Sequence, residues 1–306
     1  MTSGGRPNVG ASVRARLLNR SRDTGEDFQA LLRRYAAERF LYRLGQSRHR
    51  GRYVLKGGML LALWGETIYR PTRDLDFSGE GESSGTAIAS TVAEICAVQV
   101  RDDGIAFDTS NLTVEPIHEE GAYQSHRARF EATIAKARVR MQIDFGFGDR
   151  VYPRPTEVDF PVLLEAPRPR IRVYSREAVV AEKVHAMVVN GDRNSRYKDF
   201  YDIFTLARHF PFEGPLLTTA VRTTFERRGT SFAQTTPIAL TPEFYRDPAR
   251  VNLWQGYVSR TMLRDPPSHF ADAGETVLSF LRQPWDALAL GSEFIANWPE
   301  GGPWRH

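Results

Sequence analysis

The sequence has one cysteine, Cys96, and no long apolar run. A single cysteine excludes an internal disulfide framework and any metal site built on paired cysteines. No stretch reaches the roughly 18–20 apolar residues that a transmembrane helix needs. The basic N-terminus also lacks the apolar segment of a secretory signal. We therefore expect a cytoplasmic protein that makes no use of a membrane.

Lysine is also scarce. Of the 41 basic residues only four are lysines, namely Lys56, Lys136, Lys183 and Lys198. A GC-rich genome tends to encode arginine wherever either residue serves, so a lysine that remains is more often needed as a compact, mobile ammonium group. The bias therefore makes these four lysines candidates for a functional role.

The remaining composition is that of a globular protein. Hydrophobic residues make up 41% and charged residues 25%, which excludes disordered, collagen-like and coiled-coil classes. A chain of 306 residues is long enough for two domains. Its net charge of +4 is unevenly spread, because residues 1–53 hold twelve arginines against four acids. Such a basic segment suits a polyanion, although a solvated arm and surface helix explain it equally well.

Apolar periodicity predicts a mixed α/β first half. A helix is expected over residues 27–44, a strand at 53–55, a helix starting at 59–64, a strand at 74–77, a helix at 86–100, a strand at 105–118 and a hairpin of 126–134 with 137–147.

A proline-rich stretch at 153–169 then marks a boundary or a long connection. Beyond it the pattern becomes helical. Helices are expected over 175–190, 197–209, 215–227, 242–262 and 271–283.

Two short motifs carry chemistry. Lys56-Gly57-Gly58 lies where a strand meets a helix, and two glycines there allow the backbone to approach a phosphate closely. Asp74 and Asp76 are two residues apart on the next strand, so both carboxylates project to one face. Oxygen ligands of this kind suit a hard divalent cation such as Mg²⁺. Two solvated aspartates at a surface turn would look the same.

A third carboxylate follows in the sequence Ile143-Asp144-Phe145. An aspartate between apolar neighbours near the end of a strand can point into a cleft. Together with Asp74 and Asp76 it completes a set that could hold two metal ions and activate a hydroxyl group.

These motifs, in this order, resemble the polymerase-beta-like nucleotidyltransferase superfamily. A wider pattern resembles the AbiEii/AbiGii toxin family of nucleotidyltransferases, related to the MenT toxins of mycobacteria, over roughly residues 25–210. The segments that carry it are FLYRLGQS (40–47), VLKGGMLLALW (54–64), RPTRDLDFSG (70–79), MQIDFGFGD (141–149), REAVVAEKVHAMV (176–188) and RYKDFYDIFTLAR (196–208).

The resemblance implies an α+β fold with three parts. These are a flexible basic arm at 1–24, a polymerase-beta-like nucleotidyltransferase domain with a mixed sheet at 25–165, and an α-helical domain at 170–306. It also implies that the helical domain contributes Lys183 and Asp199 to the catalytic residues. A salt-bridged pair of surface helices is the simpler explanation of those two residues taken alone.

By the same resemblance, Asp74, Asp76 and Asp144 would bind Mg²⁺. The expected nucleotide-binding residues are Lys56, Gly57, Gly58, Arg70, Arg73, Lys183 and Lys198. The activity implied is transfer of nucleotides from an NTP to an RNA acceptor, with the 3′ end of tRNA as the expected site. The implied partner is a cognate antitoxin protein, and the basic residues 14–52 would bind the RNA.

Two alternatives stay open. The enzyme could label a protein hydroxyl group instead of RNA, because the matched motifs do not include acceptor recognition. A non-catalytic module that binds RNA or a partner protein could use the same scaffold, although three intact carboxylates argue against that.

Overall fold

The computed structural model describes residues 8–65, 70–117, 125–148, 151–261, 263 and 265–306. The chain divides into two compact units. Unit 1 comprises Met1–Leu63, Pro71–Gly148 and Glu157–Val173, and unit 2 comprises Trp64–Arg70, Asp149–Thr156 and Tyr174–His306. Unit 2 thus takes two short segments from residues 25–165, in addition to the C-terminal region that the resemblance assigned to a helical domain.

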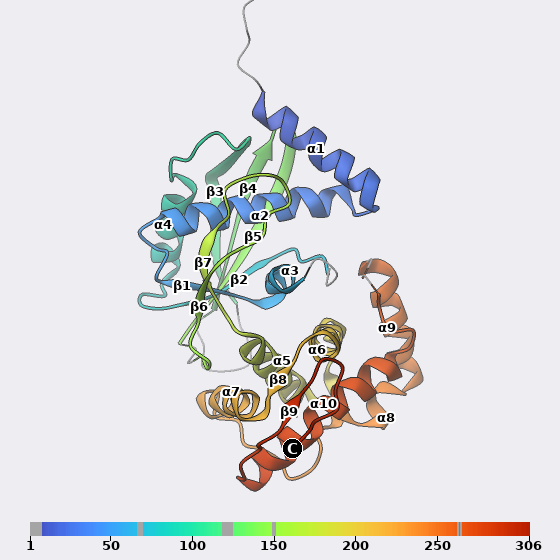
Figure 1. Ribbon diagram of the computed structural model, residues 1–306. Coiled ribbons are helices and arrows are strands. Elements are labelled where there is room, and N and C mark those ends of the chain that lie inside the picture. The colour runs from blue at the N-terminus through green and yellow to red at the C-terminus, as the bar shows by residue number, and fades with distance from the viewer. Residues whose placement is uncertain (1–7, 66–69, 118–124, 149–150, 262, 264) are drawn as a thin grey trace, which may run out of the picture. The chain divides into compact units, whose positions relative to one another are not determined.

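Unit 1 is built on a seven-stranded mixed sheet with the strand order β3-β4-β5-β2-β1-β7-β6 (Figure 1). The strands are β1 (Tyr53–Lys56), β2 (Leu75–Gly79), β3 (Ile105–Ile117), β4 (Ser125–Ile134), β5 (Ala137–Phe147), β6 (Thr156–Asp159) and β7 (Arg170–Val173). Strand β2 runs antiparallel to β1 and parallel to β5. The mixed sheet that the resemblance implied is confirmed.

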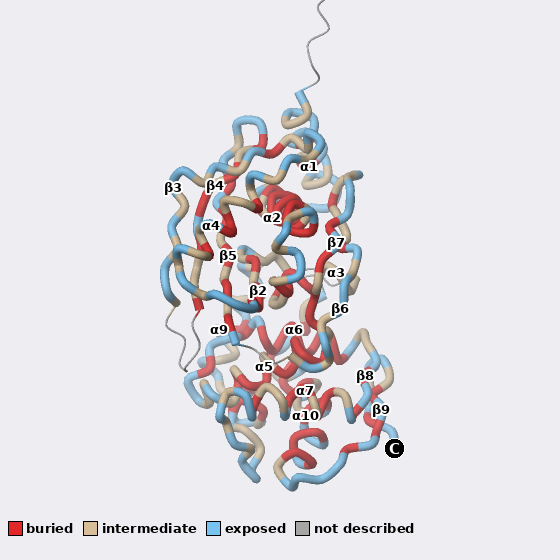
Figure 2. Tube along the Cα trace, turned by 90° about the vertical axis from the view of Figure 1, so that its left-hand side faces the viewer, coloured by how far each residue is buried: buried red, intermediate tan, exposed pale blue. Residues whose placement is uncertain are grey.

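Helices cover one face of this sheet. They are α1 (Val9–Thr24), α2 (Phe28–Gln46) and α4 (Gly85–Cys96), and a 3₁₀ turn at Gly57–Leu60 leads into the short helix α3 (Leu61–Trp64). Helix α2 begins at Asp27, whose carboxylate accepts a hydrogen bond from the Ala30 amide. It is the most deeply buried helix of unit 1 (Figure 2). Its Phe40 packs on Phe107 of β3 and Phe130 of β4.

Strand alternation separates the two faces of the sheet. Leu55, Phe77 and Phe145 lie at neighbouring register positions and are buried against the helices, with the rings of Phe77 and Phe145 stacked. The residues next to them in sequence therefore point to the opposite face, where the polar side chains lie.

Residues 9–24 form helix α1 instead of the flexible arm expected there. The sequence is rich in arginine, but Val13 and Leu17 lie one turn apart and both are buried. Residues 1–7 of the expected arm lie outside the described residues.

Strands β4 and β5 form a hairpin joined by two residues, Ala135 and Lys136, with Ile134 opposite Ala137. Ala135 has a φ of 54°, a conformation that glycine adopts more readily than alanine. This turn fixes the register of the whole hairpin, because each residue on β4 then has a single partner on β5.

Unit 2 is mainly helical. Its helices are α5 (Arg176–Asn190), α6 (Tyr197–His209), α7 (Gly214–Arg227), α8 (Pro242–Tyr245), α9 (Pro248–Thr261) and α10 (Phe270–Leu290), and its short strands are β8 (Phe212–Glu213) and β9 (Asn297–Trp298). None of the helices in the described part of the chain is long and apolar enough to cross a membrane.

Two of these helices differ from expectation. The single helix expected over 242–262 is divided, because Asp247 caps a new helix that starts at Pro248. Helix α10 continues through Pro284 to Leu290, and burial of Trp285 and Leu288 beyond the proline offsets the lost hydrogen bond.

Candidate functional site

A row of four charged residues crosses the polar face of the sheet in unit 1. Arg127 on β4 lies opposite Asp144 on β5, Asp144 is in register with Asp76 on β2, and Asp76 lies opposite Lys56 on β1. Residues paired in this way point to the same face of a sheet. The order of charges along the row is therefore positive, negative, negative, positive. We call these four residues the charged row.

Arg127 and Asp144 form a two-pronged ion pair within the row. Nε of Arg127 lies 2.8 Å from Oδ1 of Asp144, and Nη2 lies 2.7 Å from Oδ2. The hydrogen bond to Asp144 raises the pKa of Arg127, and the nearby charges of Asp74 and Asp76 act in the same direction. Three carboxylates therefore act on one guanidinium group.

Gly57 leaves the space that Asp76 occupies. Its φ of 72° lies in the left-handed region, and a Cβ built on it would lie 2.1 Å from Oδ2 of Asp76. No other residue type fits both the conformation and the space. The space beside the glycine turn, where a phosphate was expected to bind, thus holds the carboxylate of Asp76.

The other predicted residues of unit 1 surround this place. Asp74 immediately precedes β2, and its carbonyl oxygen accepts a hydrogen bond of 3.2 Å from Thr72 Oγ1. Gly58 is buried in the 3₁₀ turn, whereas Arg73 is exposed. The structure thus brings Lys56, Gly57, Asp76 and Asp144 together.

The chemistry of this donor set fits a hard divalent cation, because carboxylate oxygens are what Mg²⁺ binds. The geometry differs from that of an assembled metal centre. Among the described residues, no group of three or more histidine, cysteine, aspartate and glutamate side chains is placed to hold a metal ion. Both oxygens of Asp144 face Arg127 instead.

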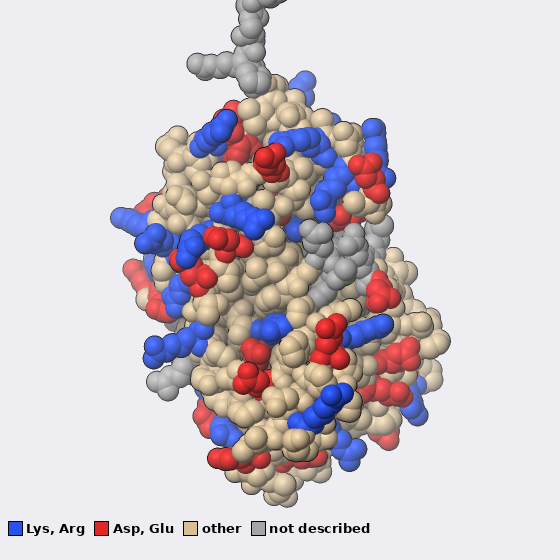
Figure 3. All heavy atoms as spheres, viewed as in Figure 1, with Lys and Arg blue, Asp and Glu red and all other residues tan. Residues whose placement is uncertain are grey.

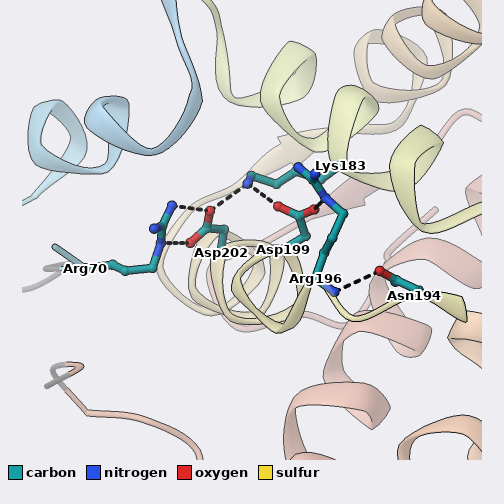
Figure 4. A network of polar contacts seen from close by, with 6 residues as sticks. All are labelled: Arg70, Lys183, Asn194, Arg196, Asp199 and Asp202. Atoms are coloured by element: carbon teal, nitrogen blue, oxygen red, sulfur yellow. Dashed lines mark hydrogen bonds and ion pairs between the residues drawn. The ribbon is translucent and has the colours of Figure 1, made fainter. Parts of the chain in front are cut away.

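A second cluster lies in unit 2, around Lys183 on α5 (Figure 4). Its Nζ donates to Oδ1 of Asp199 at 2.8 Å and to Oδ2 of Asp202 at 2.6 Å, and both aspartates lie on α6. The two aspartates are three residues apart and so lie on one face of α6, where they share this lysine. Asp199 and Asp202 are fully buried, so this is not the solvated surface pair that was the simpler alternative.

Two arginines complete this network. Arg70 donates through Nε and Nη2 to both oxygens of Asp202, at 2.8 and 3.1 Å, and Arg196 Nε donates to Oδ2 of Asp199 at 2.6 Å. We call these five residues the buried ion network. Three cations against two carboxylates leave it one positive charge in excess.

The charges in the network stabilise one another. Burial opposes the charged form of Lys183, but its two aspartate partners outweigh burial and raise the pKa of the lysine. Burial also opposes ionisation of Asp199 and Asp202, and their cationic partners still hold both pKa values below the usual range. Lys183, Asp199 and Asp202 are therefore charged at neutral pH.

Two predicted nucleotide-binding residues of unit 2 are placed differently. Arg70 has most of its side chain buried and grips Asp202, so it positions the network. Lys198 is exposed at the first turn of α6, and its pKa is lowered by partial desolvation, against the pull of Asp199.

Three further polar or ionisable residues, to which no catalytic role was assigned, have structural roles. Ser175 caps α5, with its hydroxyl oxygen accepting a hydrogen bond from the Ala178 amide. His185 packs on Phe225 and contacts Thr230 and Arg228, and burial lowers its pKa to about 4. Burial raises the pKa of the Cys96 thiol to about 12, so this cysteine is not a reactive thiolate.

Residues 39–282 match the model of the family described as nucleotidyl transferase AbiEii toxin, type IV toxin–antitoxin system. The chain belongs to the AbiEii family. It is thus a nucleotidyltransferase of a toxin–antitoxin system, and membership implies a nucleotide substrate and an antitoxin partner. The match spans both units.

A solved structure from H. pylori shows the same fold. A crystal structure from H. pylori, described as a candidate nucleotidyltransferase, matches 88% of this AbiEii chain and 100% of its own with a TM-score of 0.51 and 14% identity. The structure of JHP933 from Helicobacter pylori matches 86% of this chain and 94% of its own, with a TM-score of 0.49 and 14% identity. Among curated proteins none matches.

Sequence reasoning assigned no role to three residues of these clusters, namely Arg127, Arg196 and Asp202. The hairpin held the signal for Arg127. Once a two-residue turn at 135–136 pairs Ile134 with Ala137, the partner of Asp144 is Arg127. Arg196 precedes Asp199 by three residues, a spacing that allows an ion pair at a helix start.

Proposed function

We propose that this AbiEii protein is a Mg²⁺-dependent enzyme that transfers nucleotides from an NTP to RNA, with the 3′ end of tRNA as the acceptor. The observation that carries the proposal is the charged row, in which Asp76 and Asp144 stand side by side beside the Gly57 turn. Adjacent carboxylates at a glycine turn provide what phosphoryl transfer requires, namely cation ligands next to a phosphate-binding backbone.

In this proposal Asp74, Asp76 and Asp144 hold the divalent cation. When bound, the cation supplies charge neutralisation of the triphosphate and lowers the pKa of an attacking hydroxyl group. Asp144 orients that hydroxyl group, and Lys56 with the backbone of Gly57 and Gly58 binds phosphate oxygens.

Exposed cations complete the phosphate contacts. Arg73 and Lys198 are exposed and able to move to a ligand. Lys183 and Asp199 serve the same reaction in the family motifs, and the excess positive charge of the buried ion network supports a role in binding the polyphosphate. Arg70 contributes through its grip on Asp202.

The RNA-binding surface is smaller than the arginine count suggested. Within residues 14–52, Arg39 and Arg43 are buried, and Arg43 is paired with Asp103 at 2.7 Å. Figure 3 shows basic side chains beside acidic ones on the face that it presents. The exposed arginines of this segment are Arg14, Arg16, Arg22, Arg48 and Arg50, of which Arg48 is paired with Glu94 at 2.8 Å.

Incubation with the four labelled NTPs, Mg²⁺ and separate pools of RNA and protein tests the proposal. We expect label on RNA, loss of label with chelator, and loss with Asp74→Ala in a protein that keeps its melting temperature. Label on the protein pool alone would support the protein-modifying alternative. Equal RNA labelling by Asp74→Ala and wild type would refute the assignment of the carboxylates.

A further inference from the structure

The sequence motifs assign no role to Arg127, yet this residue engages a carboxylate at the centre of the charged row. Both oxygens of Asp144 accept hydrogen bonds from its guanidinium group, at 2.8 and 2.7 Å. A guanidinium fork matched to a carboxylate in this way is stronger and more directional than a single contact. Asp144 is therefore held in one orientation.

The charges of the row explain why a cation is needed at this position. Asp76 and Asp144 lie on adjacent strands, about 4.8 Å apart along the sheet, a spacing at which two carboxylates repel. Arg127 and Lys56 flank them and balance their two charges. A divalent cation at the carboxylates would supply the same compensation, which makes the ion pair with Arg127 dispensable.

The two kinds of cation also compete for the same oxygen atoms. Arg127 occupies one lone pair on each oxygen of Asp144 and fixes the plane of the carboxylate. The side chains of Arg127 and Asp144 are 30% and 19% exposed, so the pair can open into solvent without disturbing the core.

We propose that Arg127 is a positioning residue that holds Asp144 while the carboxylates lack a metal ion and releases it when a divalent cation binds. The proposal rests on the proposed function, because it takes Asp74, Asp76 and Asp144 as the ligands of that cation. A released guanidinium group beside the carboxylates is a fork-shaped donor for the phosphate oxygens of an NTP. Arg127 would thus change partner from Asp144 to the substrate as the metal binds.

Titration calorimetry with Mn²⁺, in the absence of nucleotide, tests the competition directly. The variants are Arg127→Gln, which removes the charge, and Arg127→Lys, which keeps the charge without the fork. The matched control is Arg129→Gln, because Arg129 is two residues away on the same strand and face and forms its own ion pair with Glu115 at 2.6 Å.

We expect Arg127→Gln to bind Mn²⁺ about fivefold more tightly than wild type, the change expected when a partly exposed ion pair no longer has to be broken. Arg127→Lys should lie between the two, and Arg129→Gln should match wild type. Circular dichroism serves to check that each variant is folded. If Arg127→Gln does not fold, Arg127→Lys still tests the proposal.

Two results would overturn the inference, and they are distinguishable. Equal or weaker Mn²⁺ affinity in a folded Arg127→Gln variant shows that Arg127 does not compete with the metal, and leaves the proposed function standing. Absence of Mn²⁺ binding in wild type and in all variants overturns the inference together with the proposed metal-dependent chemistry.

Discussion

Lys183 and Asp202 form an ion pair in the interior of unit 2, with Nζ 2.6 Å from Oδ2. The aspartate is fully buried and the lysine side chain is 10% exposed. A buried charge without a partner is far more costly than a buried pair, so each member of this network depends on the others.

Replacing Lys183 with methionine should therefore destabilise the protein strongly. The substitution keeps the length of the side chain and leaves Asp199 and Asp202 with one cation fewer. Each aspartate keeps one arginine and loses one charged donor, so we expect the free energy of unfolding to fall by about 1.5–3 kcal/mol, measured by urea denaturation. Lys136→Met, in the exposed turn of the hairpin, is the control and should change it little. A cost below about 1 kcal/mol for Lys183→Met would contradict the role given to the network.

Asp76→Asn should abolish nucleotidyl transfer and leave the fold intact. The side chain keeps its size but loses the charge that a cation needs. We expect the rate of labelling to fall by at least about 100-fold, in line with the loss of a single electrostatic contact to a transition state. Asp159→Asn, exposed at the end of β6, should keep full activity. Retained transfer by Asp76→Asn would exclude this carboxylate from the chemistry.

Gly57→Ala should be poorly tolerated, unlike the same substitution at an ordinary surface glycine. The added Cβ would collide with Oδ2 of Asp76 at 2.1 Å, in a conformation that disfavours alanine. We expect loss of activity and a fall in stability of about 1 kcal/mol or more. Gly51→Ala is the matched control, since no atom lies within 4 Å of its added Cβ. If both variants behave alike, the space left by Gly57 is not what positions Asp76.

Glu38 should make stability depend on pH. It is fully buried on α2, and burial raises its pKa to about 7, although Arg34 and the Leu163 amide favour the charged form. The folded protein thus binds this proton more tightly than the unfolded chain does. The stabilisation is complete below the unfolded pKa of about 4.3 and is lost as the pH rises towards 7, by up to about 3 kcal/mol.

Urea denaturation between pH 4 and 8 measures this effect. Glu38→Gln removes the titrating group, so the slope of stability against pH should flatten across that window. The control Glu157→Gln, on the exposed side of β6, should keep the wild-type slope. An unchanged slope in Glu38→Gln would assign the pH dependence to other groups.

Much of the sheet unit could be predicted from sequence, because its signals are local. Alternating residues on β4 and β5 gave the hairpin almost to the residue. Strands β6 and β7 were missed because both are short. Strand β6 lies in the proline-rich stretch, and β7 follows that stretch and pairs with β1, which is distant in sequence. The expected end of the last long helix before Pro284 was wrong, because burial of Trp285 and Leu288 keeps α10 helical beyond the proline.

The candidate site divides in the same way. The motifs located Asp76, Asp144 and Lys183, since each lies within a recognisable run of sequence. Arg127, which holds Asp144, lies outside every motif, and Arg70 lies in a motif that does not indicate its partner, Asp202. The sequence around an arginine does not indicate which carboxylate it pairs with. Strand register or packing is needed to identify the partner.

The two-residue turn between β4 and β5 immediately precedes β5, and Asp144 lies near the other end of that strand. Surface turns usually tolerate insertions and deletions well. Here one added residue would shift β5 against β4, and every side chain of the shifted strand would exchange faces. Asp144 would then enter the apolar core and Phe145 would face solvent. Insertions or deletions at residues 135–136 should therefore abolish activity, although no chemistry takes place there.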